Sequence, residues 1–187
     1  NKTSIFHFIF SDFMRIISGK HKGRRITAPE KLPVRPTTDR AKEALFSILD
    51  SRYYFDGKNV LDLFSGTGNI AFEFSSRGIE HITSVDNNTN CIQFIDKTSS
   101  ELNLNISTIK SDCIKYLGSC EKQFNIIFAD PPYNFEDHHK IKEIIFERNL
   151  VKEDGCLIIE HDNSTSFEEE NIEVRKYGAV HFSIFSF

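Results

Sequence analysis

Apolar positions along the chain follow two alternating spacings, and these spacings predict its secondary structure. From Lys58 onward, short continuous apolar runs alternate with stretches in which apolar residues stand three or four positions apart, the patterns of buried strands and of helices. The expected strands are Asn59–Leu63, His81–Asp86, Asn105–Lys110, Asn125–Ala129, Cys156–His161, Ile172–Lys176 and Ala179–Ser186. The expected helices between them are Ile70–Arg77, Thr89–Leu102, Cys113–Leu117 and His138–Asn149. The pattern predicts an α/β protein with a seven-stranded, mostly parallel sheet that finishes in an antiparallel C-terminal hairpin.

The first forty residues have a different pattern, which predicts a small β-hairpin and an extended linker. Met14–Ser18 and Arg24–Thr27 are strand-like runs on either side of a turn at Gly19–Gly23. Three prolines then disfavour regular structure, and a helix is expected from Thr38, where apolar residues begin to recur at helical spacing. The chain therefore divides into an N-terminal segment at 1–13, a basic hairpin arm with its linker at 14–37, and one domain at 38–187. For the first segment, an upstream extension or misjudged start and an ordered strand are both open.

The composition limits the class of protein. A chain of 187 residues with 39% hydrophobic and 27% charged residues is long enough for one domain with a buried core. The apolar run Ile5–Phe10 is far shorter than the roughly 20 residues that a membrane-spanning helix requires. The four cysteines are scattered without a C-x-x-C pair. This spacing favours a reduced, cytoplasmic protein without structural zinc.

The charge is distributed unevenly along the chain. The net charge is −4, but residues 1–42 carry ten Lys or Arg against three Asp or Glu, whereas residues 43–187 carry thirteen against twenty-four. A basic arm on an acidic body suits a protein that meets a polyanion at one end, although a solvated basic flank has the same composition. The expected RNA contacts are Arg15, Lys20, Lys22, Arg24, Arg25, Arg35, Thr37 and Arg40. For the last three, helix capping and an ion pair with Asp39 or Glu43 are the alternative.

A glycine-rich turn follows the first strand of the expected sheet. The segment Val60–Ala71 reads V-L-D-L-F-S-G-T-G-N-I-A, and glycines allow the backbone to approach a ligand. Gly66 and Gly68 lie in a G-x-G-x-x-A pattern, and Asp86 ends the next strand twenty residues past Gly66, so an NAD-binding Rossmann enzyme is a competing hypothesis. Asp62 favours S-adenosylmethionine, because its carboxylate would repel a pyrophosphate but suits an ammonium group.

The pattern D-x-F-x-G-x-G resembles the first motif of the Rossmann-like methyltransferases, and Asp86 resembles the acidic residue of their second motif. Asp112-Cys113 follows the third strand, where this superfamily places a contact to adenine, although a helix cap has the same sequence. We therefore expect the Rossmann-like fold of class I methyltransferases, which use S-adenosylmethionine and release S-adenosylhomocysteine. The expected cofactor contacts are Asp62, Phe64, Gly66, Gly68, Asn69, Asp86, Asn87, Asp112 and Cys113.

The motif with the most specific chemistry is Asp130-Pro131-Pro132-Tyr133, at the end of the fourth expected strand. The prolines cannot continue a sheet ladder, and they make the turn rigid. An exocyclic amine of a nucleobase is a poor nucleophile because its lone pair is conjugated with the ring. Hydrogen bonds to the Asp130 carboxylate and to a carbonyl of the Pro131-Pro132 turn would orient that lone pair toward a methyl group, and Tyr133 would stack on the extruded base. These four residues are the expected catalytic residues.

This motif occurs in methyltransferases of adenine N6 and of guanine N2, so it indicates an amine without selecting the base. The expected sheet occupies nearly all of the chain after residue 58, which leaves the basic hairpin to select the substrate. A small basic hairpin suits a structured RNA that is recognised by its shape and phosphates.

Segments of the arm, together with the two motifs above, resemble the RsmD family of bacterial 16S rRNA guanine-N2 methyltransferases. These segments are Met14–Gly19, Lys22–Ile26 and Arg35–Phe46, and the resemblance extends nearly to the C-terminus. It implies methylation of one guanine amine in 16S rRNA, with S-adenosylmethionine, on the 30S subunit or an assembly intermediate. The chain departs from the family at Asp112-Cys113, where Asp-Ala is common, and at Glu160-His161-Asp162, where a Glu-Ser type of ending is more familiar.

Two other functions stay open at this point. An adenine-N6 methyltransferase of DNA or RNA would use the same residues, and a non-catalytic ribosome-assembly factor would bind RNA with a vestigial cofactor fold. We expect no metal ion and no membrane association. A monomer is expected because the arm occupies the surface beside the site.

Overall fold

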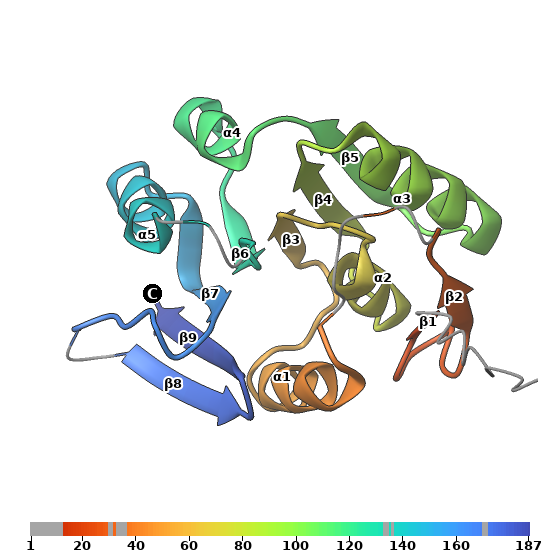
Figure 1. Ribbon diagram of the computed structural model, residues 1–187, viewed down its shortest axis with the longest axis horizontal. Helices are drawn as coiled ribbons and strands as arrows, with labels where there is room; N and C mark the ends of the chain where they lie inside the picture. The colour runs from red at the N-terminus through yellow and green to blue at the C-terminus, as the bar shows by residue number, and fades with distance from the viewer. Residues whose placement is uncertain (1–12, 30–31, 33–36, 133–134, 136, 170–171) are drawn as a thin grey trace, which may run out of the picture.

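A seven-stranded sheet forms the centre of the computed structural model, which describes residues 13–29, 32, 37–132, 135, 137–169 and 172–187. Its strands are β3 (Asn59–Leu63), β4 (His81–Asp86), β5 (Ile106–Lys110), β6 (Phe124–Ala129), β7 (Val151–His161), β8 (Ile172–Tyr177) and β9 (Val180–Ser186). The strand order is β5-β4-β3-β6-β7-β9-β8, and β9 runs antiparallel to the two strands beside it, β7 and β8 (Figure 1). The predicted sheet with its antiparallel C-terminal hairpin is thereby confirmed.

In the part of the chain that the structure describes, five helices cover the two faces of this sheet (Figure 1). They are α1 (Asp39–Arg52), α2 (Asn69–Ser76), α3 (Thr89–Leu102), α4 (Cys113–Ser119) and α5 (His138–Glu147). Alternate residues of β6 point to opposite faces: Ile126 and Phe128 pack with α1 and α2, and Ile127 and Ala129 pack with α4 and α5. Burial on both faces explains why this strand reads as a continuous apolar run. Within the described ranges, no helix is long and apolar enough to cross a membrane.

The largest difference from the expected elements is the start of β7. The strand begins at Val151 rather than Cys156, and its pairing with β6 is irregular between these two residues. Asp154 has a positive φ of 60° in this stretch, as in a bulge. Because the residues Lys152–Asp154 are all charged, the apolar pattern did not reveal that the strand extends through them.

The N-terminal arm is a two-stranded hairpin that packs against the domain. Strands β1 (Phe13–Arg15) and β2 (Arg25–Thr27) pair antiparallel, and Met14, Ile16 and Ile26 of the hairpin are buried against α2 and α3. At the turn, Lys20 donates its backbone N–H to the carbonyl of Ser76 at 2.7 Å. A Cβ at Gly19 would lie 1.8 Å from that same carbonyl oxygen, so this close approach requires glycine.

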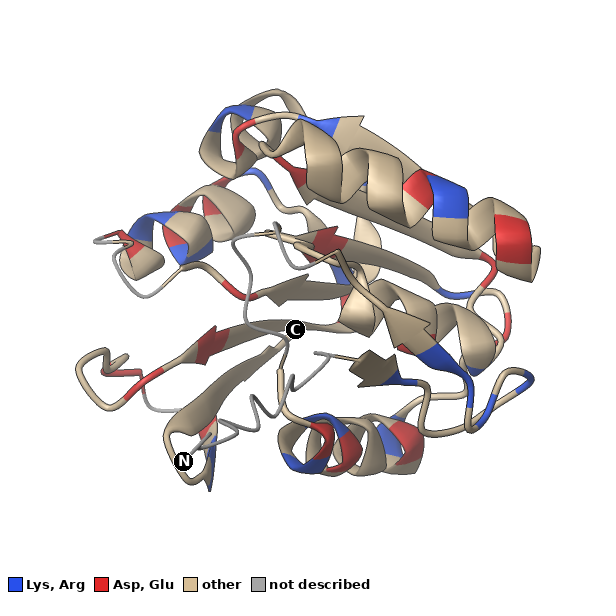
Figure 2. Ribbon diagram, turned by 45° about the vertical axis from the view of Figure 1, so that its right-hand side comes forward, with Lys and Arg blue, Asp and Glu red and all other residues tan. Residues whose placement is uncertain are grey.

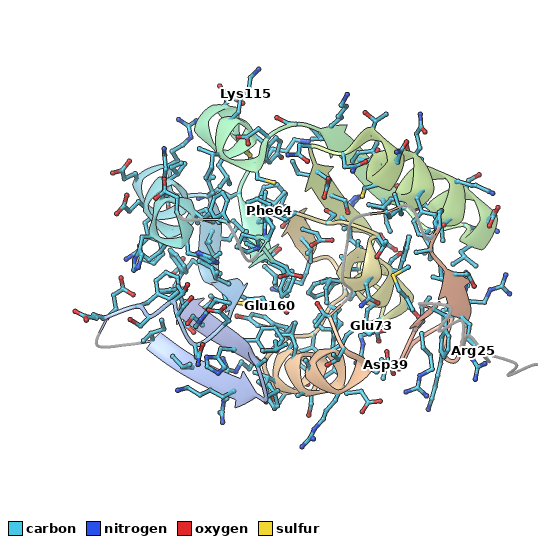
Figure 3. The ribbon with its side chains drawn as sticks, viewed as in Figure 1. Arg25, Asp39, Phe64, Glu73, Lys115 and Glu160 are labelled. Carbon is cyan, nitrogen blue, oxygen red and sulfur yellow. The ribbon has the colours of Figure 1, made fainter. Side chains whose placement is uncertain are left out.

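A buried ion pair joins the hairpin to the two helices behind it. Lys42 of α1 and Glu73 of α2 are fully buried, with Nζ and Oε2 3.6 Å apart. Glu73 also accepts hydrogen bonds from the backbone N–H groups of Ile17 and Ser18, at 2.8 and 3.0 Å. Figure 3 places Glu73 between α1 and the hairpin. Arg77, which follows α2, donates from Nε to Oε1 of Glu73 at 2.8 Å, so one carboxylate satisfies donors from three parts of the chain.

Lys42 extends this connection to the start of α2. Its ammonium group donates to the carbonyl of Arg15 at 2.6 Å and to Oδ1 of Asn69 at 2.8 Å. Asn69 in turn donates from Nδ2 to the carbonyl of Thr37 at 3.1 Å. Burial lowers the pKa of Lys42, and the negative charge of Glu73 opposes this lowering. The hairpin, α1 and the loop before α2 are therefore fixed by one set of polar contacts.

We predict that Glu73→Ala lowers the free energy of unfolding by about 3–5 kcal/mol, because the buried charge of Lys42 and two backbone N–H groups lose their acceptor. Urea denaturation followed by circular dichroism measures this loss. Glu101→Ala is the matched control: its partner Lys97 is 3.9 Å away and the Glu101 side chain is 61% exposed, so a change below about 0.5 kcal/mol is expected. Equal stability of the two variants would contradict the anchoring role.

Candidate active site

The carboxyl ends of β3 and β6 meet where the strand order reverses. β3 pairs with β4 on one side and with β6 on the other. The chain therefore leaves β3 and β6 toward opposite edges of the sheet. Open α/β sheets form a crevice at such a point. A cavity of about 630 Å³ lies here and is lined by the loop after β3 and by the turn after β6. The two motifs identified in the sequence therefore face one cavity.

Carboxyl groups are numerous among the described lining residues of this cavity. Those that line it belong to Asp62, Asp86, Asp112, Asp130, Glu160 and Asp162, and none of its described lining residues is a Lys or an Arg. Such a cavity attracts a cation and repels a polyphosphate. S-adenosylmethionine fits this charge, because it carries a sulfonium and an ammonium group and no phosphate. A nicotinamide dinucleotide does not.

Asp62 is the most deeply buried of these acidic residues, with 2% of its surface exposed. Its Oδ2 atom has no hydrogen-bond partner in the part of the chain that the structure describes. Burial, and then the charge of Asp130, raise the pKa of Asp62 well above its usual range. A buried acceptor that lacks a donor is suited to a ligand that supplies one. The ammonium group of S-adenosylmethionine is such a donor.

The glycine-rich loop is held in place by Asp86, at the end of β4. Asp86 accepts the backbone N–H of Gly66 at 2.8 Å through Oδ2, and the N–H of Asn88 at 2.8 Å through Oδ1. Asp86 also lines the cavity, and each of its oxygens can accept a further hydrogen bond, which suits the two hydroxyl groups of a ribose. Gly68 has a φ of 77°, and a Cβ there would lie 2.9 Å from the side chain of Ile95. Both facts require glycine at this turn.

The structure separates the other predicted cofactor residues into two groups. Phe64, Asn69, Asn87 and Asp112 line the cavity together with Asp62, Gly66 and Asp86. Gly68 and Cys113 do not line it. The Sγ of Cys113 accepts the backbone N–H of Phe64 at 3.3 Å, so this thiol stabilises the loop through a hydrogen bond. Asp112 also caps α4 by accepting the N–H of Lys115 at 2.9 Å, which is the helix cap that its sequence allows as the alternative.

The predicted catalytic turn follows β6 directly. Burial raises the pKa of Asp130 to about 7, and Pro131 and Pro132 line the cavity beside it. Tyr133 lies outside the described residues. Phe135, which the sequence analysis did not identify, also lines the cavity, and its ring meets that of Phe64 at 5.3 Å between centroids. No periodicity or motif indicates this aromatic wall, because it joins two loops.

The end of β7 contributes a further group that sequence analysis left unassigned. Glu160 is 8% exposed and lines the cavity, and its Oε2 accepts the hydroxyl of Thr37 at 3.0 Å. Burial, and then the charge of Asp130, raise the pKa of Glu160 to about 8. Thr37, predicted to contact RNA at the entrance to the site, is buried in the cavity wall instead. Figure 3 places Glu160 in the centre of the molecule and Arg25 at its outer edge.

Two histidines also line the cavity. His138 is the first residue of α5, as its polar N-terminal position in the sequence predicted, and it lines the cavity with His161. Burial lowers the pKa of both imidazoles, so they are neutral near pH 7. The Nε2 atom of His161 is 2.7 Å from the hydroxyl of Ser183.

The basic residues of the arm occupy two different environments. Those at the turn and on β2 are exposed, and Figure 2 shows them gathered on the hairpin at the edge of the molecule; they are Lys20, Lys22, Arg24 and Arg25. Arg15 instead pairs with Asp39 at 3.0 Å and with Glu43 at 3.4 Å. The ion pair considered for Arg40 thus belongs to Arg15. Arg40 is exposed on α1, and Arg35 lies outside the described residues.

This sheet order, the acidic cavity at its switch point and the Asp-Pro-Pro turn define a Rossmann-like methyltransferase of the class that uses S-adenosylmethionine. The sequence model of the family described as conserved hypothetical protein 95 matches residues 14–186. The chain belongs to this family, which is the RsmD family. The predicted fold class, family and cofactor are thereby confirmed.

Similar proteins agree with this assignment. The Bacillus subtilis protein YlbH, named as an rRNA methyltransferase, is 36% identical over 83% of this chain and 86% of its own length. Ribosomal RNA small subunit methyltransferase D of Escherichia coli is 30% identical over 86% of this chain and 76% of its own. The solved structure of the Escherichia coli methyltransferase yhhF superimposes with a TM-score of 0.81 at 24% identity, and covers 93% of this chain and 97% of that one.

We predict that Asp62→Asn weakens the binding of S-adenosylhomocysteine by about 10-fold to 100-fold, because a charge-assisted hydrogen bond to the ammonium group becomes a neutral one. Isothermal titration calorimetry measures the affinity without turnover. Asp56→Asn, at an exposed loop position, is the control and should bind as the unaltered protein does. Unchanged affinity in the Asp62 variant would remove Asp62 from the cofactor site.

Proposed function

We propose that this protein transfers the methyl group of S-adenosylmethionine to the exocyclic N2 amine of one guanine in 16S rRNA. The substrate is the 30S subunit or an assembly intermediate of it, in the cytoplasm. The observation that carries the proposal is the Asp130-Pro131-Pro132 turn, which opens into an acidic cavity at the switch point of the sheet. The names of the relatives support rRNA as the substrate, and the family resemblance supports guanine N2.

The cofactor supplies an electrophilic methyl group. The Asp130 carboxylate accepts a hydrogen bond from the amine of the base, holds its lone pair in line with that methyl group and takes up the proton that the amine loses. The Pro131-Pro132 turn supplies a rigid backbone carbonyl as the second acceptor. Phe64 and Phe135 form an apolar wall beside the turn, which excludes water and strengthens these hydrogen bonds. Tyr133 is the proposed stacking residue.

The basic hairpin is the proposed RNA-binding surface. Lys20, Lys22, Arg24 and Arg25 are exposed on it, and a hairpin anchored through the buried Glu73 presents them as a rigid group. Phosphate contacts from these side chains position an RNA without reading its sequence. Arg15 contributes less, since Asp39 and Glu43 already compensate its charge. The protein acts as a monomer in this proposal.

Product analysis tests the proposal directly. We expect the purified protein and labelled S-adenosylmethionine to yield N2-methylguanosine from 30S subunits that lack the modification, and no product from naked 16S rRNA or duplex DNA. Nucleoside digestion followed by mass spectrometry identifies the product, and mapping locates the guanine. N6-methyladenine would instead establish the alternative adenine-N6 methyltransferase, and no product on any substrate would favour the non-catalytic assembly factor.

Asp130→Ala serves as the mechanistic control for this experiment. The variant should lose about 100-fold to 1,000-fold in turnover and keep its affinity for S-adenosylhomocysteine. Asp137→Ala, at an exposed position seven residues further on, should retain turnover. Normal turnover by Asp130→Ala would disprove its role in aligning the amine.

We also predict that the single-turnover rate of methyl transfer rises with pH, by about tenfold per unit below pH 7, and levels off above pH 8. Asp130 loses its proton near pH 7, and only its carboxylate form can take up the proton that the amine loses. Rapid-quench measurements with saturating 30S subunits give this rate.

Unfolding does not explain such a loss at low pH. The pKa values of Asp130 and Glu160 are higher in the folded protein than in an unfolded chain, so the folded state binds more protons and these groups do not destabilise it as the pH falls from 8 to 5. A rate independent of pH between 6 and 8 would contradict the role of the ionised carboxylates.

A further inference from the structure

Glu160 is a buried carboxyl group that neither cofactor binding nor amine alignment explains. It follows an apolar stretch of β7, Leu157–Ile159, all of which is buried. An acidic side chain at such a position requires desolvation of its charge, which is costly without a compensating partner. The cofactor-binding loop comes from β3, and the amine is held by the turn after β6. Glu160 belongs to the side of the cavity where the base must lie.

The sheet places Glu160 next to Asp130. Ala129, the last residue of β6, pairs with Ile159 of β7 in the parallel register, so Asp130 and Glu160 are the residues that follow this pair. Adjacent strands lie about 4.8 Å apart. By the alternation of the two strands, both side chains point to the face that α1 and α2 cover, as Phe128 and Ile158 do. Two carboxyl groups therefore stand side by side in the cavity.

Thr37 fixes the orientation of the Glu160 carboxyl group. Its hydroxyl donates to Oε2 at 3.0 Å, and its own carbonyl is held by Nδ2 of Asn69. Among the described residues, Oε1 of Glu160 has no hydrogen-bond donor, and the side chain lines the cavity. The carboxyl group is thus held at one oxygen and available at the other.

The atom next to the reacting amine differs among the nucleobases. In guanine, N1 is bonded to the carbon that bears the N2 amine, and N1 carries a hydrogen. In adenine, the ring nitrogen next to the N6 amine is also N1, but it carries a lone pair. A carboxylate beside the amine-binding Asp130 accepts a hydrogen bond from guanine N1–H, whereas it repels the lone pair of adenine N1.

We propose that Glu160, oriented by Thr37, determines base specificity by accepting a hydrogen bond from N1–H of guanine while Asp130 holds the N2 amine. This proposal rests on the proposed guanine-N2 methyltransferase function. The pair of adjacent carboxylates matches the pair of adjacent donors on the edge of guanine. Rejection of a base that lacks N1–H follows, because Glu160 would then be buried against a lone pair.

The ionisation of Glu160 agrees with this role. Burial, and then the charge of Asp130, raise its pKa to about 8, and the hydrogen bond from Thr37 opposes the rise. A second donor from the base stabilises the carboxylate further. Bound guanine therefore shifts the protonation equilibrium of Glu160 toward the charged form.

The test compares guanine with 2-aminopurine, which has the same amine at C2 but a lone pair at N1. The substrates are 30S subunits reconstituted with 16S rRNA that carries either base at the methylated position found by product analysis. We expect the unaltered protein to prefer guanine by at least about 100-fold in kcat/KM. Glu160→Gln should reduce this preference to below about tenfold, since a glutamine amide can donate to a lone pair or accept from N1–H.

The ratio of the two rates separates specificity from general damage. Loss of the O6 atom in 2-aminopurine affects both proteins alike and cancels from the comparison. An equal loss of rate on both bases in Glu160→Gln would assign Glu160 a structural role and overturn the proposal, as would an unchanged preference. Glu153→Gln, at an exposed position of β7, is the matched control and should keep the preference of the unaltered protein.

Thr37→Val provides a second variant that keeps the carboxylate. It should lower the preference for guanine by about tenfold through loss of the orienting hydrogen bond, and it decides the question if Glu160→Gln does not fold. A Thr37→Val protein with the full preference would remove Thr37 from the proposal. Methylation of adenine by the unaltered protein would refute the proposed function itself. If the unaltered protein methylates guanine and the Glu160 variant still discriminates between the two bases, only the role of Glu160 is refuted.

Discussion

The structure depends on one buried charge, the carboxylate of Glu73. A carboxylate removed from water must be matched by donors, and this one takes them from the hairpin backbone, from Lys42 and from Arg77. Because Lys42 in turn binds Asn69, the position of the hairpin and the start of α2 are set together. The arm is therefore a fixed part of the domain surface, although its sequence is that of a short basic appendage.

The carboxyl groups of the cavity, unlike that of Glu73, face no Lys or Arg among the described lining residues. Asp62 on β3, Asp130 directly after β6 and Glu160 on β7 belong to three adjacent strands or their ends and share the face that α1 and α2 cover, and burial raises the pKa of each. Such a group is unfavourable for folding above the ordinary pKa of a carboxyl group. A cationic cofactor and the donor edge of a base relieve that cost when they bind. The carboxyl groups that are unfavourable for folding are therefore the ones that the ligands contact in the proposed function.

A continuous series of hydrogen bonds connects the two regions. It runs from the hairpin carbonyl of Arg15 through Lys42, Asn69 and Thr37 to Glu160. Every link involves a side chain that is buried, so water cannot easily replace any of them. The RNA-binding surface and the proposed base-recognition group are consequently positioned by the same contacts, which explains how a chain of this length can hold a substrate without a separate recognition domain.

The sequence by itself determined the elements, the class of fold and the two motifs, because periodicity and glycine or proline turns are local properties. It also located Asp62, Asp86 and Asp130 at strand ends, where α/β sheets place their sites. The tertiary structure decided which of these groups share the cavity. It placed Cys113 beneath the loop, paired Arg15 with Asp39, inserted β9 between β7 and β8, and brought Thr37 to Glu160 across 123 positions of sequence. No local pattern encodes such contacts, since each depends on the register of strands and on helices that are distant along the chain.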